Sequence, residues 1–506
     1  MTRVLSVLCL LAAAVVGAPA MAAPATIAQW RAAHEQDIVG QLDRLVRIPS
    51  VAADPKGLAA AADALVAALA ARGFSARMLT ARSGGPPAIF AAFDTAGAKR
   101  TVTFYAHYDG QPADPARWSS DPFGPVMRAP GDGGPKEIDW KTAAAPYDPE
   151  WRLSGRGVAD DKASIVAFLA AFDALRATGR KPGVNLRVFW EGEEEDGSPH
   201  LAELLGANAD LLKSDLWLIG DGPLHPSRAP TLYFGVRGML GFEATLYGPL
   251  VPLHDGHYGN WAPNPAAMAA RLIAAMRDDD GTILIPGVLD MVRAPTTAEM
   301  VAVQAVPPVE DALIDEFALG RSEGNEGLAQ SLLRPALNIR GISAGAVGAG
   351  SANAIPAEAT FAADFRLVPD QTVDGVKAAV EAFLDQKGWT LVRETPDRET
   401  RLAHPRVMKL VWMAGYPAMR TDMGLPVSQA VIATVARVAG RPVVALPTVG
   451  GSVPLNLIDA GLKVPMIGLP IANHDDNQHA ADENLRLGNL WEGIDLYAGL
   501  MTGLDW

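Results

Sequence analysis

The first half of the chain alternates short runs of strand-forming residues with longer Ala-rich or amphipathic stretches, and the alternation returns after residue 425. Short apolar runs bounded by turn residues predict strands, whereas the longer stretches predict helices. The predicted strands are residues 88–93, 102–106, 184–190, 216–219, 443–446 and 464–468. The predicted helices are residues 27–46, residues 57–72 and a segment that begins at residue 163. This alternation favours an α/β fold with a mixed, largely parallel sheet and flanking helices.

The pattern changes near Arg237, where strands and helices follow one another in a different order. The predicted strands of this part are residues 242–247, 337–342 and 359–367, and the predicted helices are residues 264–276 and 373–386. That order fits a smaller α+β domain of the ferredoxin-like kind, inserted in the larger one. We therefore expect a larger domain of residues 23–236 and 405–506, and an inserted domain of residues 237–404.

Composition narrows the class of protein. The chain has 506 residues, which is too long for one simple core and agrees with two domains. Hydrophobic residues make up 49% of it, which indicates a globular protein rather than a disordered one. The net charge of −14 argues against nucleic acid as a partner.

The N-terminus has the pattern of a cleavable export signal. Arg3 supplies the positive charge, residues 4–17 form an apolar stretch too short to span a membrane, and small residues follow. We expect residues 1–22 to be removed, which leaves a periplasmic or secreted protein without a membrane anchor. The only cysteine, Cys9, lies in this segment, so the mature chain has to bind any metal through His, Asp and Glu. Such a donor set suits zinc or manganese.

The first candidate ligands lie around His107, directly after a predicted strand. A lone strand histidine is more often satisfied within the fold than bound to a metal. Asp109 lies two residues further on, on the same face, where a carboxylate can hydrogen-bond the imidazole of a metal ligand. Asp160 and Asp161 precede the helix predicted from residue 163, and capping that helix is the simpler interpretation of both.

Further polar residues follow other predicted strands. For the acidic run 193–196 a solvated loop is the simpler interpretation, for Asp221 a turn, and for His479 a surface position. Strand ends in an α/β sheet gather at one edge, however, so these residues can meet in one site. The candidates are His107, Asp160, Glu194, Glu195, Asp221 and His479. They are enough for two divalent ions that share a bridging carboxylate, with another carboxylate left as a general base.

Residues 105–112, 155–162, 191–198 and the loop through His479 occur in the order and spacing of a known family. They resemble the signatures of the dizinc metallopeptidases that include carnosinases, aminoacylases and succinyl-diaminopimelate desuccinylases. The resemblance implies two divalent ions per subunit, with Zn²⁺ favoured and Mn²⁺ or Co²⁺ as alternatives.

Residue by residue, the resemblance implies a role for each candidate. His107 and Asp221 would bind one ion, Glu195 and His479 would bind the other, and Asp160 would bridge the two. The peptide bond between Asp160 and Asp161 is expected to be cis. Glu194, rather than Glu193, would be the general base for the metal-bridging water, and Asp109 would orient His107.

The inserted domain resembles the lid through which this family forms homodimers. Its His254 would stabilise the oxyanion in the partner's site, with a loop histidine packed at the lid edge as the alternative. Arg366 would bind a substrate carboxylate, although a structural ion pair is the other interpretation. Gly451 and Ser452 match the substrate-binding loop, although an ordinary strand-to-helix turn also fits. Glu483 lies in an Ala-Asp-Glu context where the family has Ser-x-Asn-Glu.

The expected reaction is the hydrolysis of a peptide or amide bond next to a free carboxylate. The leading expectation is a dipeptidase or carboxypeptidase-like exopeptidase acting on small peptides, and the alternative is an N-acyl-amino-acid amidohydrolase. A third possibility is an inactive periplasmic binding protein of the same fold. The presence of both Glu194 and Asp160 argues against that possibility.

Overall fold

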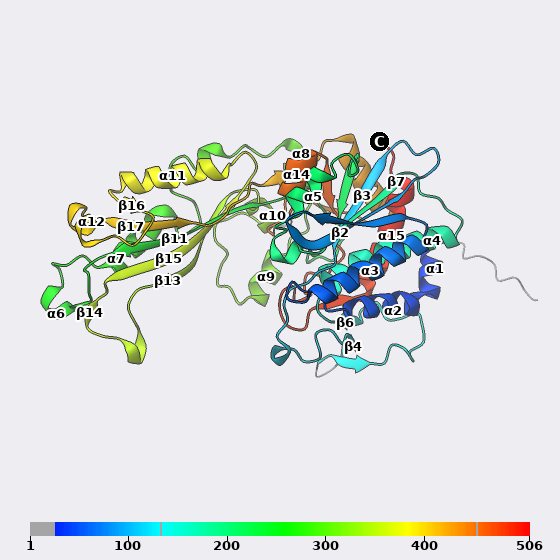
Figure 1. Cartoon of the computed structure of the whole chain (residues 1–506), viewed down its shortest axis with the longest axis horizontal. Helices are drawn as coiled ribbons and strands as arrows, with labels where there is room; N and C mark the ends of the chain where they lie inside the picture. Colours follow the sequence, from blue (N-terminus) through cyan, green and yellow to red (C-terminus); the bar gives the residue numbers. More distant parts are fainter. Residues whose placement is uncertain (1–25, 132–133, 452–453) are drawn as a thin grey trace, which may run out of the picture.

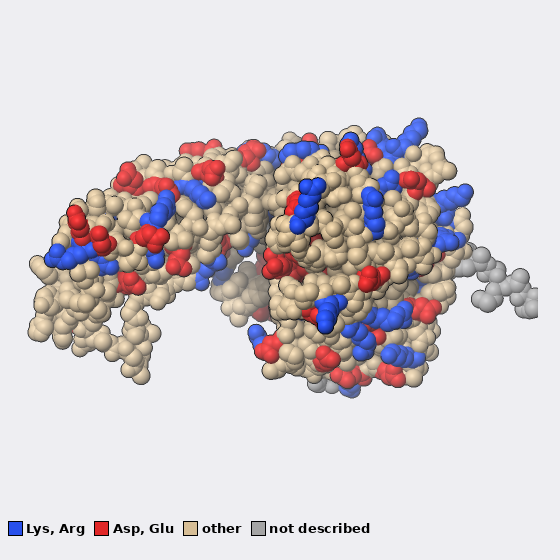
Figure 2. Space-filling model, in the orientation of Figure 1, with Lys and Arg blue, Asp and Glu red and all other residues tan. Residues whose placement is uncertain are grey.

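The computed structural model describes residues 26–131, 134–451 and 454–506, and the predicted export signal, residues 1–22, lies outside them. Figure 1 shows a larger lobe that holds both ends of the described chain and a smaller lobe beside it. None of the described helices is long and apolar enough to cross a membrane. Figure 2 shows acidic and basic side chains interspersed over one face of both lobes.

The larger lobe is built on an eight-stranded sheet with the order β1-β2-β7-β3-β8-β20-β9-β19. Its strands are β1 Ser75–Ala81, β2 Gly84–Phe93, β3 Thr101–His107, β7 Asn185–Glu191, β8 Leu216–Ile219, β9 Thr231–Tyr233, β19 Val444–Leu446 and β20 Met466–Gly468. The neighbours β7, β3, β8 and β20 run parallel, as do β9 and β19. The remaining pairs, β1 with β2, β2 with β7 and β20 with β9, are antiparallel. The prediction of a mixed, largely parallel sheet is confirmed.

Helices cover both faces of this sheet, because side chains alternate between the faces along each strand. Phe104 of β3 belongs to the core on one face, and its neighbour Tyr105 belongs to the core on the other. Helix α4 lies between the sheet and α1, α2 and α15, which explains why it is apolar on nearly every side. The helices are α1 Ile27–Ala33, α2 Glu35–Val46, α3 Pro55–Ala71, α4 Ala163–Ala177, α5 Leu201–Ala207, α13 Pro426–Ala439, α14 Leu455–Leu462 and α15 Leu487–Gly503.

A second, four-stranded sheet of this lobe has the order β21-β6-β4-β5. Its strands are β4 Val126–Ala129, β5 Lys136–Ile138, β6 Arg152–Ser154 and β21 Asn484–Arg486, and the short helix η1 Pro115–Arg117 precedes them. The antiparallel pairing of β6 with β21 joins two distant parts of the chain. It brings the turn after β6, which leads to Asp160, against the loop before β21, which carries His479.

The smaller lobe is a five-stranded sheet of order β13-β15-β11-β17-β16 that packs against α7 and α11. Its elements are β11 Gly238–Tyr247, α7 Pro265–Met276, β13 Ala336–Ser343, β15 Glu358–Leu367, α11 Val373–Gln386, β16 Thr390–Val392, α12 Arg398–Ala403 and β17 Val407–Trp412. This lobe, which we call the lid, therefore has the expected α+β architecture. Its sheet extends beyond the predicted boundary at residue 404, because β17 pairs with β11 in the middle of the sheet.

Two further parts of the lid matter for the site. At its outer end, β12 Leu253–His254 pairs with β14 Ala354–Ile355, next to α6 Asp255–Tyr258 and η5 Gly348–Gly350. At the junction with the larger lobe, β10 Gly235–Val236 pairs with β18 Met419–Arg420. Residues 277–335, which we call the insert, contain η4 Leu289–Met291, α8 Thr297–Gln304, α9 Glu310–Glu316 and α10 Leu328–Ser331. Helices α8, α9 and α10 of the insert lie at the junction of the two lobes in Figure 1, where α8 packs against β19, whereas Ile283, Ile285 and Val288 pack in the core of the lid.

Candidate metal centre

Three of the candidate ligands, His107, Glu195 and Asp221, come from the carboxyl ends of neighbouring parallel strands. His107 ends β3, opposite Glu191 at the end of β7. The acidic turn η3 Glu194–Asp196 follows β7, and Asp221 follows β8 on the other side of β3. Parallel strands end at the same edge of a sheet, so these side chains face one another as the sequence predicts.

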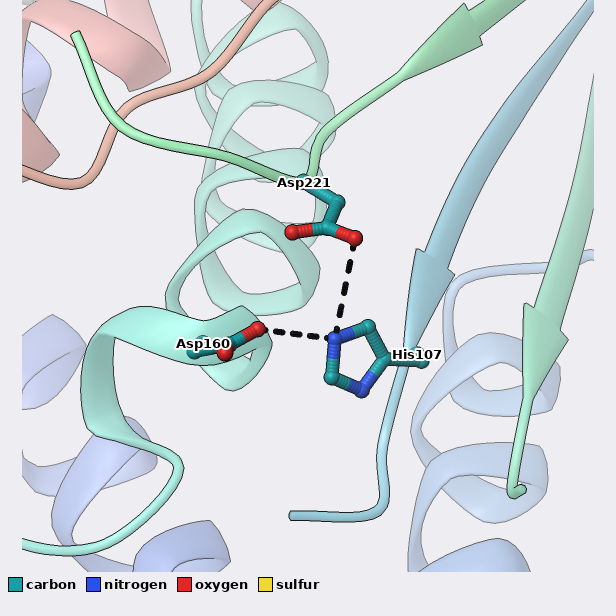
Figure 3. A group of neighbouring side chains, drawn as sticks. All are labelled: His107, Asp160 and Asp221. Atoms are coloured by element: carbon teal, nitrogen blue, oxygen red, sulfur yellow. Dashed lines mark hydrogen bonds and ion pairs between the residues drawn. The ribbon is translucent and has the colours of Figure 1, made fainter. Parts of the chain in front are cut away.

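His107, Asp160 and Asp221 form the first group of donor atoms. His107 Nε2 lies 2.9 Å from Asp160 Oδ1 and 4.0 Å from Asp221 Oδ2, and all three side chains are buried. Figure 3 shows both carboxylates directed at the same ring nitrogen. One imidazole nitrogen and two carboxylate oxygens converging on one point are suitable ligands for a divalent cation.

Asp160, Glu195 and His479 form the second group. His479 Nε2 lies 3.2 Å from Asp160 Oδ2 and 3.2 Å from Glu195 Oε2. Asp160 thus presents one oxygen to each histidine, and within each group all the donor atoms lie within 4.8 Å of one another. Nitrogen and carboxylate oxygen donors, without a thiolate, fit two divalent metal ions that share Asp160.

The side chains of the two groups shift one another's pKa values. Burial disfavours a charged His107, but hydrogen bonds with Asp109 and Asp160 hold its pKa well above the usual value. Burial also opposes ionisation of Asp160, yet hydrogen bonds with His107 and His479 hold the pKa of this carboxyl below its usual range. Burial and the charge of Asp160 raise the pKa of Asp221 to about 7. Crowded carboxylates of this kind are stabilised by a nearby cation.

Glu194 lies beside both groups without belonging to either. Its carboxyl lines a cavity of about 360 Å³ together with Asp160, Asp221 and His479. Burial, and behind it the charges of Asp221 and Asp160, raise the pKa of Glu194 well above its usual value. A carboxyl whose proton affinity is raised beside a reaction cavity suits proton transfer.

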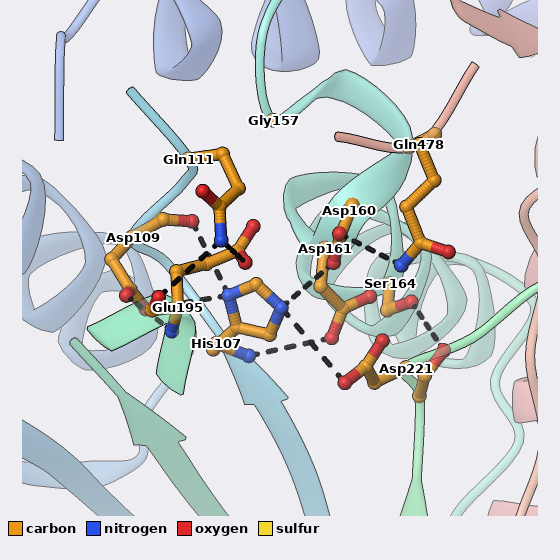
Figure 4. A network of polar contacts seen from close by, with 12 residues as sticks. His107, Asp109, Gln111, Gly157, Asp160, Asp161, Ser164, Glu195, Asp221 and Gln478 are labelled. Carbon is orange, nitrogen blue, oxygen red and sulfur yellow. Dashed lines mark hydrogen bonds and ion pairs between the residues drawn. The ribbon is translucent and has the colours of Figure 1, made fainter. Parts of the chain in front are cut away.

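Asp109 contacts one ligand of each group, His107 and Glu195. Its Oδ1 lies 3.3 Å from His107 Nδ1, and its backbone oxygen lies 3.2 Å from the same nitrogen. Its Oδ2 accepts a hydrogen bond from the backbone N–H of Glu195 at 3.0 Å. These contacts leave His107 Nε2 directed at Asp160 and Asp221, as Figure 4 shows.

Glu483 holds the turn that carries Asp160. This turn, η2 Val158–Lys162, contains the cis peptide bond between Asp160 and Asp161 that the resemblance implies. Glu483 is fully buried, and its Oε1 accepts hydrogen bonds from the backbone N–H groups of Ala159 at 3.0 Å and of Asp160 at 3.1 Å. Its Oε2 accepts from Gly157 N at 2.9 Å and from Arg156 Nη1 at 2.7 Å.

Three polar residues of the site were not predicted as such from the sequence. Gln111 Nε2 donates to Glu195 Oε2 at 2.7 Å, and Gln478 Nε2 donates to Asp160 Oδ2 at 2.8 Å. Both residues lie inside the motifs around His107 and His479, and that position is a usable signal. For Glu483, the only sequence signal of a role in the site was its altered motif context. Its partners in the Asp160 turn are more than 300 positions away in the sequence.

The lid residues predicted for the site lie apart from it. Among the described residues, the cavity lining includes Gly451 but not His254 or Arg366. His254 lies at the outer end of the lid, where its side chain is 56% exposed. Arg366 on β15 pairs with Asp364, Nε to Oδ2 at 3.4 Å, which is the structural ion pair considered as its alternative. Ser452 lies outside the described residues.

Comparison with known proteins extends over nearly the whole chain. The family model of Peptidase family M20/M25/M40 matches residues 103–503. The chain is 27% identical to the Cys-Gly metallodipeptidase dug1 of Schizosaccharomyces pombe, over 92% of this chain and 94% of that protein. It is 26% identical to the Beta-Ala-His dipeptidase of Homo sapiens, over 82% of this chain and 76% of that protein. Its fold matches that of the M20 family metallo-carboxypeptidase Sso-CP2 from Sulfolobus solfataricus with a TM-score of 0.73 at 24% identity. The match covers 92% of this chain and 99% of that chain.

Proposed function

This chain belongs to the peptidase family M20/M25/M40 and is a metallohydrolase, and we propose that it hydrolyses dipeptides. The observation that carries the proposal is the pair of donor groups that share Asp160, with Glu194 beside them at the same cavity. The names of two relatives, a Cys-Gly metallodipeptidase and a Beta-Ala-His dipeptidase, support a dipeptide rather than a longer peptide.

His107 and Asp221 would hold one ion, Glu195 and His479 the other, and Asp160 both. When bound, two divalent ions supply Lewis-acid polarisation of the substrate carbonyl and lower the pKa of water. The nitrogen and oxygen donors support zinc as the metal, with manganese and cobalt as the alternatives. Glu483 and Asp109 keep Asp160 and His107 in place.

Glu194 is the general base in this proposal. It takes a proton from the attacking water and passes it to the nitrogen that leaves. The carbon–nitrogen bond breaks as the new carbon–oxygen bond completes a carboxylate, so the products are two amino acids. The raised pKa of Glu194 supports this role, because the group has to hold the proton between the two steps.

We also propose that the enzyme works as a homodimer in which His254 serves the partner's site. Apolar side chains at the outer end of the lid are strongly exposed, with Trp261 at 79% and Val347 at 91%. Strand β13 is an outer strand of the lid sheet, and of the described strands only β15 pairs with it in that sheet, so its other edge can pair with a second copy. His254 lies in β12, next to α6 and β14 at the outer end of the lid, and it does not line the cavity of its own metal centre; action across such a dimer explains this position.

The export pattern of residues 1–22 supports a periplasmic or secreted location, which we propose as well. Fractionation of cells that express the full chain tests this location. Recovery of the uncleaved protein in the cytoplasm would contradict it.

The proposed reaction is tested by comparing Glu194→Gln with Glu193→Gln on a panel of dipeptides and N-acyl amino acids. Loss of the base should lower kcat about 10²- to 10⁴-fold, with little change in KM. Glu193→Gln is the matched control, because Glu193 accepts hydrogen bonds from His200 outside the cavity. Full turnover by Glu194→Gln would refute the base, and cleavage of N-acyl amino acids alone would favour the amidohydrolase.

A further inference from the structure

The cavity beside the metal centre has a second wall that the proposed chemistry does not use. The first wall carries the polar residues Asp160, Glu194, Asp221 and His479. The second wall is apolar and is formed by Val306, Val309, Leu328, Leu332, Leu446 and Val449. A cavity with a polar end and an apolar end favours a ligand with both kinds of group.

Most of this apolar wall comes from the insert. Val306 and Val309 lie between α8 and α9, and Leu328 and Leu332 lie in and after α10. Glu310 ties the two segments together: its Oε2 accepts from Val309 N at 3.0 Å, and its Oε1 accepts from Leu328 N at 2.7 Å. The wall is therefore a built structure rather than a chance approach of two loops.

The insert is also fixed to the larger lobe next to the predicted substrate loop. A Cβ atom added at Gly450 would lie 3.5 Å from Leu332 Cδ2, so the leucine side chain reaches this loop. On the other side, Glu299 of α8 forms an ion pair with Arg420 of β18 at 3.0 Å. The insert thus forms part of the same cavity that the residues of the metal centre line.

The charges around the cavity select which end of a dipeptide enters it. Among the described residues that line it, none is Lys or Arg, whereas Asp160, Glu194, Asp221 and Glu310 are acidic. Ions bound at the metal centre would neutralise Asp160 and Asp221, which leaves Glu310 as the acidic lining residue outside that centre. Beside the insert a substrate carboxylate is therefore repelled, and the free amino group of a dipeptide is attracted. The amino-terminal residue, rather than the carboxyl-terminal one, therefore fits the cavity.

We propose that the insert forms a specificity pocket for a large apolar side chain on the amino-terminal residue of the dipeptide. This inference rests on the proposed function for the identity of the substrate. Leu328 is 42% exposed despite lining the cavity, so an apolar side chain that enters removes its surface from water. The substrates of choice are then dipeptides such as Leu-Gly and Phe-Gly, ahead of Gly-Gly and Asp-Gly.

The test compares Leu328→Ser with Leu319→Ser in the zinc-loaded protein. Leu319 is 48% exposed and belongs to the same insert, but it does not line the cavity, which makes it a matched control. In the wild type, kcat/KM for Leu-Gly should exceed that for Gly-Gly at least about tenfold. Leu328→Ser should lower this ratio about tenfold, and Leu319→Ser should leave it unchanged.

Binding gives a second readout that does not depend on turnover. Calorimetry with the Glu194→Gln protein should show tighter binding of Leu-Gly than of Gly-Gly, and Leu328→Ser added to it should remove the difference. Equal use and equal binding of the two dipeptides by the wild-type pocket would overturn the inference while leaving dipeptide hydrolysis intact. Selective binding of Leu-Gly without cleavage of any dipeptide would instead overturn the proposed function alone.

Discussion

The backbone N–H of Asp160 donates a hydrogen bond of 3.1 Å to Oε1 of Glu483, which lies 323 positions further along the chain. Through this bond, the carboxylate of Glu483 holds the residue that both donor groups share. The antiparallel pairing of β6 with β21 brings the two segments together. The geometry of the metal centre therefore depends on a contact between the two parts of the larger lobe that the lid separates.

Glu483→Gln should weaken metal binding without removing a ligand. The amide has one acceptor oxygen in place of two, so the donors on its other side, among them Arg156, lose their partner. Partners that orient ligands in this way are worth about 10- to 100-fold in metal affinity. Zinc titration by calorimetry measures the effect. Asp482→Asn is the control, since Asp482 contacts Ser119 instead. Unchanged zinc affinity in Glu483→Gln would show that the carboxylate has no positioning role.

Glu299 should make the stability of the protein depend on pH in the acid range. Burial opposes its ionisation, but hydrogen bonds from Arg293, the backbone of Thr296 and Arg420 outweigh this and lower its pKa to about 2. Because the pKa of the folded state is below the ordinary value of 4.5, the stabilisation is complete above pH 4.5 and is lost as pH falls towards 2.

Glu299→Gln should therefore cost about 3 kcal/mol at neutral pH, because it leaves the buried Arg420 without a charged partner. The difference from the wild type should shrink between pH 4.5 and about 2, where wild-type Glu299 becomes protonated. Urea unfolding across this range measures it. Glu316→Gln, at an exposed position of the same insert, should have no such effect. A difference that stays constant with pH would contradict the assignment.

Mixing two inactive variants tests the proposed contribution of His254 across a dimer. Glu194→Ala and His254→Ala protomers each lack one part, but a mixed dimer would contain one complete site. Random exchange should restore about a quarter of the wild-type activity, since half of the dimers are mixed and each has one working site. Sedimentation confirms the dimer, and labelled protomers confirm exchange. No recovery despite proven exchange, or a fully active monomer, would refute the proposal.

Local motifs made much of this molecule predictable from its sequence. His107, Glu195 and Asp221 lie at or just after the ends of short apolar runs. Asp160 precedes a helix, and His479 lies in the loop before β21. Because parallel strands end at one edge, the convergence of His107, Glu195 and Asp221 followed from the pattern. The roles that the resemblance gives to these residues remain predictions.

Features that depend on long-range contacts were not predictable in the same way. β17 belongs to the lid because its partner is β11, and nothing in its own sequence distinguishes it from a strand of the larger lobe. The apolar wall of the insert faces the metal centre only through anchors such as the pair of Glu299 with Arg420. Hydrophobic periodicity reports which side of an element is buried, but it does not say against what.

The most direct test of the central claim is the hydrolysis of a dipeptide by chelator-treated protein during titration with Zn²⁺. We expect no cleavage before metal is added, and activity that rises until about two ions are bound per chain, in keeping with two donor groups that share one carboxylate. Asp160→Asn should abolish the rise. Full dipeptide cleavage by the metal-free protein, or saturation of both metal sites with no cleavage of any dipeptide, would contradict the account.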